Sequence, residues 1–174
     1  MDAYETIVRH RAVRHFNGEP LPEPVLLRIL EAGRWAGSSK NTQNWHFIVV
    51  RDRQTLNQLA ECGRYASHLR TAAVAVALAT EPGLWNAFDA GRAAQNMMLA
   101  AWADGVGSCI AGMHHEGCAR RVLGAPENLV VLLAISFGYP MLDAPKTIEG
   151  QPREKVLARV GRKPLDEIVH WDKW

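Results

Sequence analysis

Apolar residues follow two patterns along the chain, and each pattern predicts a different kind of element. Four short apolar runs are rich in valine, isoleucine and alanine and are bounded by glycine, proline or polar residues: 45–52, 72–80, 107–113 and 129–140. The longest of them falls well short of the roughly 18 continuous apolar residues that a membrane-spanning helix requires. The pattern therefore predicts four β-strands and no membrane span.

Between these runs, apolar residues recur at steps of three and four, which is the spacing of one face of a helix. This spacing predicts helices over 2–9, 20–37, 54–62, 85–104 and 116–124. The second of these has prolines before or in its first turn and Gly37 at its expected end. Four strands interspersed with helices indicate an α/β or an α+β domain with one central sheet, and the pattern alone leaves both classes open.

The long helix predicted over 85–104 carries small residues at three- and four-residue steps: Ala87, Ala90, Gly91, Ala94 and Ala101. Small side chains allow another backbone or a flat ligand to approach closely. Two interpretations remain open. The helix either packs tightly inside its own core or forms part of a subunit interface.

The composition limits the function classes. With 174 residues, 48% of them hydrophobic, the chain is expected to form a single domain over residues 1–174 with a sizeable core. Its 20 Lys and Arg residues against 18 Asp and Glu give a net charge of only +2. A general nucleic-acid-binding protein shows a broader basic excess. We therefore expect neither a nucleic acid nor a membrane as partner.

The cysteines and the N-terminus predict a cytoplasmic protein. Cys62, Cys109 and Cys118 are odd in number and have no CxxC spacing, which is more typical of reduced cytosolic thiols than of a disulfide framework. The first ten residues are acidic early and contain no long apolar run, so no signal peptide is expected.

Two segments carry candidate chemistry. Five of the seven residues from Arg9 to His15 can carry positive charge, which favours either a solvated face or a site for one anion. Guanidinium groups such as those of Arg11 and Arg14 bind phosphate through paired, charge-assisted hydrogen bonds. The polar segment 38–44 is either a self-satisfied turn or a set of donors and acceptors for a ring edge that carries carbonyls and nitrogens.

Other catalytic classes lack their sequence signatures. His114, His115 and Glu116 are adjacent, and no third ligand has metal-binding spacing, so no metal site is expected. The chain contains no G-x-S-x-G nucleophile motif, no G-x-G-x-x-G dinucleotide fingerprint and no Walker A loop.

Five sequence blocks, in this order, resemble the FMN-dependent nitroreductase family. They are HRAVRHF (10–16), GSSKNTQNWHF (37–47), DAGRAAQNMMLAAWADGVGS (89–108), GYP (138–140) and RKPLDEIVHW (162–171). The resemblance covers nearly the whole chain. If NADH or NADPH is used, it is expected to visit the flavin only transiently.

The resemblance implies an α+β fold with a mixed central β-sheet flanked by helices. It also implies an obligate homodimer with FMN at the interface. The tail from about residue 143, which is rich in Pro, Lys and Arg, is expected to extend across the partner subunit and wrap it. The implied activity passes reducing equivalents from NAD(P)H, by a ping-pong mechanism, to an electron-poor acceptor such as a nitroaromatic or a quinone. Alternatives are a dehalogenase, dehydrogenase or flavin-fragmenting relative, or a flavin-binding protein without turnover.

The resemblance also implies roles for particular residues, none of them a covalent catalyst. Arg11, together with Arg162 or Lys163, would bind the FMN phosphate, and Arg14 would approach the pyrimidine side of the flavin. The remaining contacts would come from the polar loop and from the third predicted strand: Ser38, Ser39 and Asn41 to the flavin and ribityl chain, and Ala111 and Gly112 at the N5 edge.

The chain departs from the family pattern at four positions. His10 replaces an arginine and Ala12 a serine, so the phosphate loses a hydroxyl contact, although the Ala12 amide could still serve. Gly37 and Asn44 each replace a proline, which predicts a less rigid polar loop.

Four aromatic residues lie close to the matched blocks. Trp35 and Trp45 are expected either in the core or beside the flavin. Trp85 and Phe88 either form a lid over the flavin or belong to the ordinary core.

Overall fold

Strand β2 (Val74–Thr80) is buried along its whole length and forms the centre of the molecule. The computed structural model describes residues 2–115, 117–141 and 160–174. Its four strands, β1 (Trp45–Val50), β2, β3 (Gly107–Gly112) and β4 (Val130–Gly138), form one sheet in the order β1-β2-β4-β3. Strands β1 and β3 are therefore its edges.

Each pair of neighbouring strands in this sheet is antiparallel. The expected mixed sheet is thus not found among the four strands. A parallel contact occurs as one isolated bridge, between Ala12 and Ser108 of β3. Burial patterns in the sequence report which faces of a strand are covered, not its direction, so they could not have settled this point.

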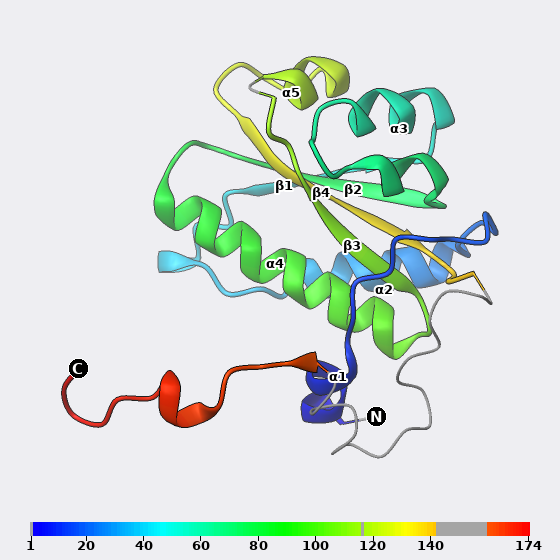
Figure 1. The fold of residues 1–174 in the computed structure, drawn as a ribbon. Helices are drawn as coiled ribbons and strands as arrows, with labels where there is room; N and C mark the ends of the chain where they lie inside the picture. The colour runs from blue at the N-terminus through cyan, green and yellow to red at the C-terminus, as the bar shows by residue number, and fades with distance from the viewer. Residues whose placement is uncertain (1, 116, 142–159) are drawn as a thin grey trace.

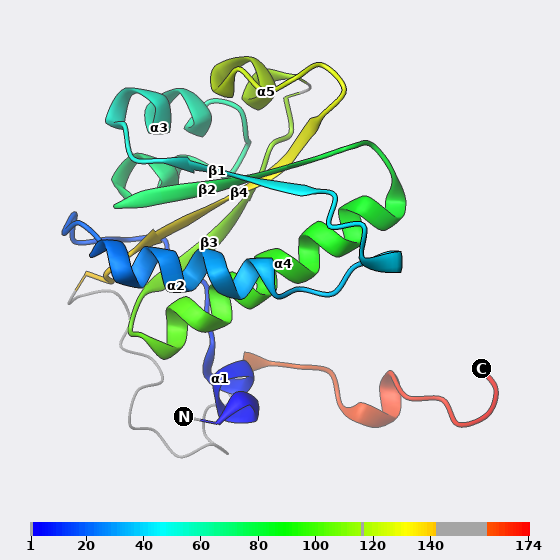
Figure 2. The ribbon, with the colours of Figure 1, turned by 180° about the vertical axis from the view of Figure 1, so that it is seen from behind.

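The two faces of β2 carry side chains of different size, because successive residues of a strand point to opposite faces. Val74, Val76 and Leu78 pack in the same cluster as helices α2 (Glu23–Arg34) and α4 (Leu84–Ala103). The three alanines on the other face pack with α3 (Arg53–Ala60) and α5 (Cys118–Leu123). Figures 1 and 2 show α2 and α4 on one side of the sheet and α3 and α5 on the other. The architecture is α+β, with the sheet between two helical layers.

Helix α2 is shorter than its predicted span. Pro22 occupies its N-cap and Pro24 its first turn, so the helix begins at Glu23. It ends at Arg34, with Trp35 as the C-cap, before the glycine that the sequence indicated as its end.

The small residues of α4 divide into two groups. Ala90, Ala94 and Ala101 are buried in the core, whereas Gly91 is exposed and nothing lies where its side chain would project. Core packing therefore accounts for the first three. None of the helices in the described ranges combines the length and apolarity needed to cross a membrane.

The N-terminal segment runs along the free edge of β3. After α1 (Ala3–Arg9), the Val13 amide donates a hydrogen bond of 2.8 Å to the Ser108 carbonyl. A Cβ atom at Gly107 would lie 2.7 Å from that of Val13, so only glycine permits this approach. The basic residues that follow α1 are thereby held against the edge strand.

The C-terminal residues 160–174 lie apart from the sheet and its helices in both views (Figures 1 and 2). They include the short 3₁₀ helix η3 (Leu165–Glu167) and several exposed apolar side chains: Leu165, Ile168, Trp171 and Trp174. The first part of the predicted tail, from 143 to 159, lies outside the described residues.

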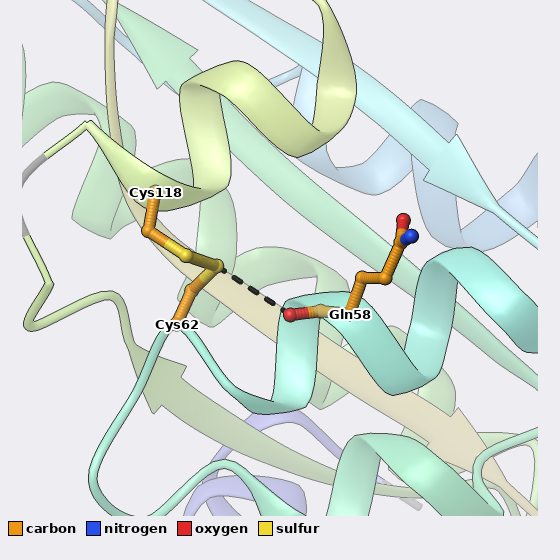
Figure 3. The surroundings of a disulfide bond; sticks show 3 residues. All are labelled: Gln58, Cys62 and Cys118. Atoms are coloured by element: carbon orange, nitrogen blue, oxygen red, sulfur yellow. Dashed lines mark hydrogen bonds between the residues drawn. A yellow bond between two sulfur atoms is a disulfide. The ribbon is translucent and has the colours of Figure 1, made fainter.

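The prediction of three reduced cysteines is wrong. Cys62, just after α3, forms a disulfide with Cys118 at the start of α5, and Cys109 is the free, buried thiol (Figure 3). The two half-cystines are 56 residues apart and meet because α3 and α5 pack side by side on the alanine face of the sheet. Sequence spacing could not reveal this contact. The cysteine argument for a cytoplasmic location is therefore lost.

Removing the disulfide is expected to destabilise the fold. A cross-link across a separation of 56 residues contributes about 4 kcal/mol in the chain-entropy model. The double variant Cys62→Ala/Cys118→Ala, and the parent protein with a phosphine reductant, should unfold at lower guanidinium concentrations, as followed by circular dichroism. The Cys109→Ala variant serves as control and should stay sensitive to the reductant. A parent midpoint that does not move on reduction would contradict the cross-link.

Candidate functional site

Arg11 and Arg162, from opposite ends of the chain, form one basic corner. The Arg11 guanidinium donates to the carbonyls of Val8 (2.7 Å) and His10 (2.6 Å) at the end of α1. Burial lowers the pKa of Arg11, and the positive charge of Arg162 lowers it further. Two cations that repel each other in this way suit an anion bound between them, and a phosphate matches the donor geometry of guanidinium groups.

Buried polar atoms without hydrogen-bond partners gather at the same edge. Among the described residues there are five such side-chain atoms, and four belong to the N-terminal segment, to β3 or to the 3₁₀ helix η2 (Ser67–Thr71): His10 Nε2, Arg11 Nε, Ser108 Oγ and His68 Nε2. Buried polar groups are almost always satisfied in folded proteins, so such a concentration indicates a ligand-binding region. The His10 ring also packs edge-on against Trp102, and burial, followed by the charge of Arg11, lowers its pKa.

Arg14 lies farther along β3. Its side chain is exposed, and its charge acts on two buried groups, His68 and Cys109. Burial, followed by the charge of Arg14, lowers the pKa of His68 to about 4, against a smaller opposing effect of the Ile110 carbonyl. Burial raises the pKa of the Cys109 thiol, and Arg14 opposes that rise. Arg14 therefore presents a cation beside the middle of the edge strand, with no ion pair to an acidic residue in the described part of the chain.

His68 connects β3 to β4 through a buried network. Its Nδ1 lies 2.7 Å from Ser136 Oγ, and that hydroxyl donates to the Cys109 carbonyl at 3.2 Å. The pKa of His68, about 4, means that the imidazole is uncharged near pH 7. The histidine is thus neutral and holds the backbone of β3 beside Arg14.

The end of β3 is held from the α3 side. Ala111 is buried, and a Cβ atom at Gly63 would lie only 2.4 Å from the Gly112 carbonyl. The Arg64 amide donates to His114 Nδ1 at 3.3 Å, and Tyr65 packs edge-on against the same imidazole. Backbone groups at Ala111 and Gly112 are therefore fixed in position, as a binding edge requires.

The polar loop before β1 has an unusual backbone. Lys40, Asn41 and Gln43 have positive φ angles of 51°, 57° and 52°, a conformation that side chains other than glycine rarely adopt. Residues held in this region cluster at functional sites, and each costs about 1–3 kcal/mol. The Ser39 amide donates to Asp89 of α4 at 3.0 Å, and the Gln43 amide donates to Ser38 Oγ at 2.9 Å. These bonds offset the cost of the loop.

The predicted site residues form two separate groups within one chain. His10, Arg11, Ala12, Arg14 and the β3 residues lie along one edge, with Arg162 and the adjacent Lys163 at its corner. The loop bearing the 3₁₀ helix η1 (Ser39–Asn41) lies at the beginning of α4, apart from α1 in both views (Figures 1 and 2). A single copy of the chain therefore does not bring the serines and Asn41 to the arginines.

The four aromatic residues beside the matched blocks differ in burial. Trp45 is buried and stacks with Phe47, so it belongs to the core, whereas Trp35 is exposed. The core interpretation of Trp85 and Phe88 is wrong, because both are exposed. They line a pocket of about 350 Å³ together with Ser38, Ser39, Asp89 and Arg92, defined here as the aromatic pocket.

The structure adds three residues that sequence reasoning did not select. Asp89 anchors the polar loop, Arg92 lines the aromatic pocket, and His68 lies beneath Arg14. Asp89 could have been found as a charged residue at a buried position of an alanine-rich helix, since unpaired charges are rarely buried. No sequence pattern indicated His68, because its partner Ser136 is 68 residues away.

Comparison with known proteins gives consistent results. The model of the nitroreductase family matches residues 7–72 and 61–139. A candidate NADH dehydrogenase/NAD(P)H nitroreductase from Archaeoglobus fulgidus is 33% identical over 150 residues, which cover 80% of this chain and 86% of that protein.

Two solved structures have a similar fold at low sequence identity. Nitroreductase A from Vibrio parahaemolyticus aligns with a TM-score of 0.84 and 26% identity, over 100% of this chain and 77% of the other. An NADPH:FMN oxidoreductase from Vibrio harveyi, in complex with NAD⁺, aligns with a TM-score of 0.82 and 26% identity, over 98% and 77% of the two chains.

The neutral state of His68 predicts how stability depends on pH. The pKa of His68 is about 4 in the fold and 6.5 for an ordinary histidine, so the unfolded chain binds more protons between these values. Its contribution is therefore complete above pH 6.5 and is lost as the pH falls toward 4, by about 3 kcal/mol in total. The His68→Asn variant should lose less stability than the parent between pH 7 and pH 4.5 in urea unfolding.

The exposed His46 on β1 provides the matched control. The His46→Asn variant should keep the pH dependence of the parent. If His68→Asn and the parent lose equal stability over this range, His68 is not the buried titrating group.

Proposed function

This chain belongs to the nitroreductase family, and we propose that it uses bound FMN to pass reducing equivalents from NADH or NADPH to an electron-poor acceptor. Such acceptors include nitroaromatics and quinones. It is an NAD(P)H-dependent oxidoreductase of the nitroreductase type. We propose further that residues 1–174 form one FMN-binding domain and that the two half-reactions follow a ping-pong sequence.

The pairing of Arg11 with Arg162 is the observation that carries the proposal. Their mutual repulsion and the unpartnered Nε of Arg11 fit the phosphate of FMN, which would accept hydrogen bonds from both guanidinium groups. Lys163 adds charge next to Arg162. His10, which replaces a family arginine, would supply its unpartnered Nε2. Ala12 would contribute through its backbone, since the bridge to Ser108 is closed by the Val13 amide.

The ring end of the site follows β3 away from this corner. The exposed cation of Arg14 would stabilise negative charge on the pyrimidine side of the flavin, and the fixed backbone at Ala111 and Gly112 would meet its N5 edge. The chemistry that bound FMN would supply is to take reducing equivalents from NAD(P)H in one half-reaction and to pass them to the acceptor in the other. The protein orients and tunes the ring and needs no covalent catalyst.

A homodimer with FMN at the interface would join the two groups of site residues. Ser38, Ser39 and Asn41 of one protomer would reach the flavin held by the arginines of its partner. The exposed apolar residues of segment 160–174 support a tail that packs on the partner subunit, because several large apolar side chains exposed together mark a protein–protein contact surface. Dependence on NAD(P)H fits a cytoplasmic location.

The cofactor can be tested directly. The purified protein should be yellow, with the absorbance of bound FMN, or should bind added FMN and be bleached by NADH or NADPH under anaerobic conditions. A colourless protein that fails to bind added FMN would contradict the proposal. Tight binding without reduction by either nucleotide would identify a flavin-binding protein instead.

The two arginines of the N-terminal segment should have separable effects. Arg11→Ala removes a phosphate contact and should weaken FMN binding by roughly 10- to 100-fold, the value of a charge-assisted hydrogen bond, measured by flavin fluorescence. Arg14→Ala should retain more FMN but lower the reduction potential of the bound flavin and slow its reduction. Arg121→Ala, at an exposed position on α5, is the control. Wild-type affinity and turnover in both variants would refute the assignment.

A further inference from the structure

The aromatic pocket exposes two large rings that the fold itself does not cover. Trp85 and Phe88 are 69% and 56% exposed, and their rings meet edge to face with centroids 6.2 Å apart. Aromatic side chains usually dominate cores and interfaces, so such a pair beside a pocket of about 350 Å³ offers apolar contact to a flat ligand. A pocket of this size suits a molecule of one or two rings better than a dinucleotide.

Arg92 gives the pocket a charge. Its guanidinium carbon lies 5.9 Å from the centre of the Phe88 ring, and its nearest acid contact is Asp89 Oδ1 at 3.6 Å. This distance is longer than the 2.7–2.9 Å or so of a charge-assisted hydrogen bond. With its side chain 48% exposed, Arg92 keeps N–H donors available to a ligand in the pocket.

The position of Arg92 depends on Gly37. A Cβ atom at Gly37 would lie only 2.7 Å from Arg92 Nη2, so any larger residue there would displace the guanidinium. The family pattern has proline at this position. Gly37 thus leaves open the space that the Arg92 guanidinium occupies. Gly37 directly precedes Ser38, which lines the same pocket as Arg92.

Asp89 connects the pocket to the polar loop. Its Oδ2 accepts the Ser39 amide at 3.0 Å while Oδ1 faces Arg92, and the carboxylate itself is buried. Ser38 and Ser39 therefore border the pocket and, in the proposed function, also contact the flavin. A ligand between Trp85 and Arg92 would lie next to the flavin ring.

We propose that Arg92 is a specificity-determining residue that selects flat aromatic acceptors carrying a carboxylate or sulfonate group. The aromatic body packs against Trp85 and Phe88, and the anionic group accepts hydrogen bonds from the Arg92 guanidinium. This inference rests on the proposed function for its placement beside FMN, but binding to the pocket can be measured without turnover. The same donors could bind the 2′-phosphate of NADPH, which the experiment separates.

The first test is equilibrium binding to the oxidised holoprotein. 4-Nitrobenzoate and its neutral isostere 4-nitrobenzamide are titrated while tryptophan fluorescence is recorded, with Trp85→Leu identifying the quenched residue. Wild-type protein should bind the benzoate more tightly, and Arg92→Gln should weaken its binding by roughly 10- to 100-fold, as expected for loss of a charge-assisted hydrogen bond. Binding of the benzamide should change less than about threefold.

The second test follows the two half-reactions of the holoenzyme separately. Reoxidation of dithionite-reduced protein by the benzoate should slow selectively in Arg92→Gln, whereas reduction by NADH and by NADPH should be unchanged. Arg28→Gln is the control, because Arg28 is an exposed arginine on α2 that faces Asp104 at the far end of α4. It should behave as wild type throughout.

Three results would overturn the inference. Equal binding of the two nitro compounds by wild type would exclude anion selection, and equal losses for both in Arg92→Gln would make the arginine merely structural. A selective loss with NADPH would assign Arg92 to the nucleotide phosphate. Failure of the proposed function is distinguishable, because it appears as absence of bound FMN or of reduction by NAD(P)H, whereas fluorescence quenching still reports the pocket.

Discussion

The hydrogen bond from the Val13 amide to the Ser108 carbonyl determines where the positive charge of this protein acts. A run of arginines and histidines after a short helix would otherwise be a solvated surface. Held against the free edge of β3, the same run places Arg11 at one end of the strand and Arg14 beside its middle. The bond exists because Gly107 leaves room for Val13. The absence of a side chain at position 107 therefore determines where Arg11 and Arg14 lie. Electrostatics at this site therefore follow from packing at its edge.

The sequence predicts the elements well because each has a local cause. Apolar runs of strand length, the prolines before Glu23 and the spacing of apolar residues act within a few positions of one another. Contacts between distant residues were not predictable in the same way. The Cys62–Cys118 disulfide, the bond of His68 to Ser136 and the bond of Ser39 to Asp89 join residues 50 or more positions apart. The basic cluster was recognisable as an anion site only through the family resemblance, and the partner Arg162 acquired a structural argument only from the fold.

The departures from the family pattern affect different parts of the structure. Ala12 removes a hydroxyl from the edge of a site that retains several other donors. Gly37 changes the geometry of a different region, because the space it leaves is occupied by the Arg92 guanidinium. Substitutions that look equally mild in the sequence thus act on opposite ends of the proposed flavin. In the proposed function, Ala12 affects how tightly the cofactor is bound, and Gly37 affects which acceptor can reach the cofactor.

The alanines of β2 have a consequence beyond the core. On one face of β2 the residues are alanines packed with α3 and α5, and on the other they are valine and leucine packed with α2 and α4. The side chains of the sheet are therefore smaller on the face that α3 and α5 cover. On the alanine face, Cys62 and Cys118, which are 56 residues apart in the sequence, are close enough to bond. The covalent link therefore depends on the packing of a strand that contains no cysteine.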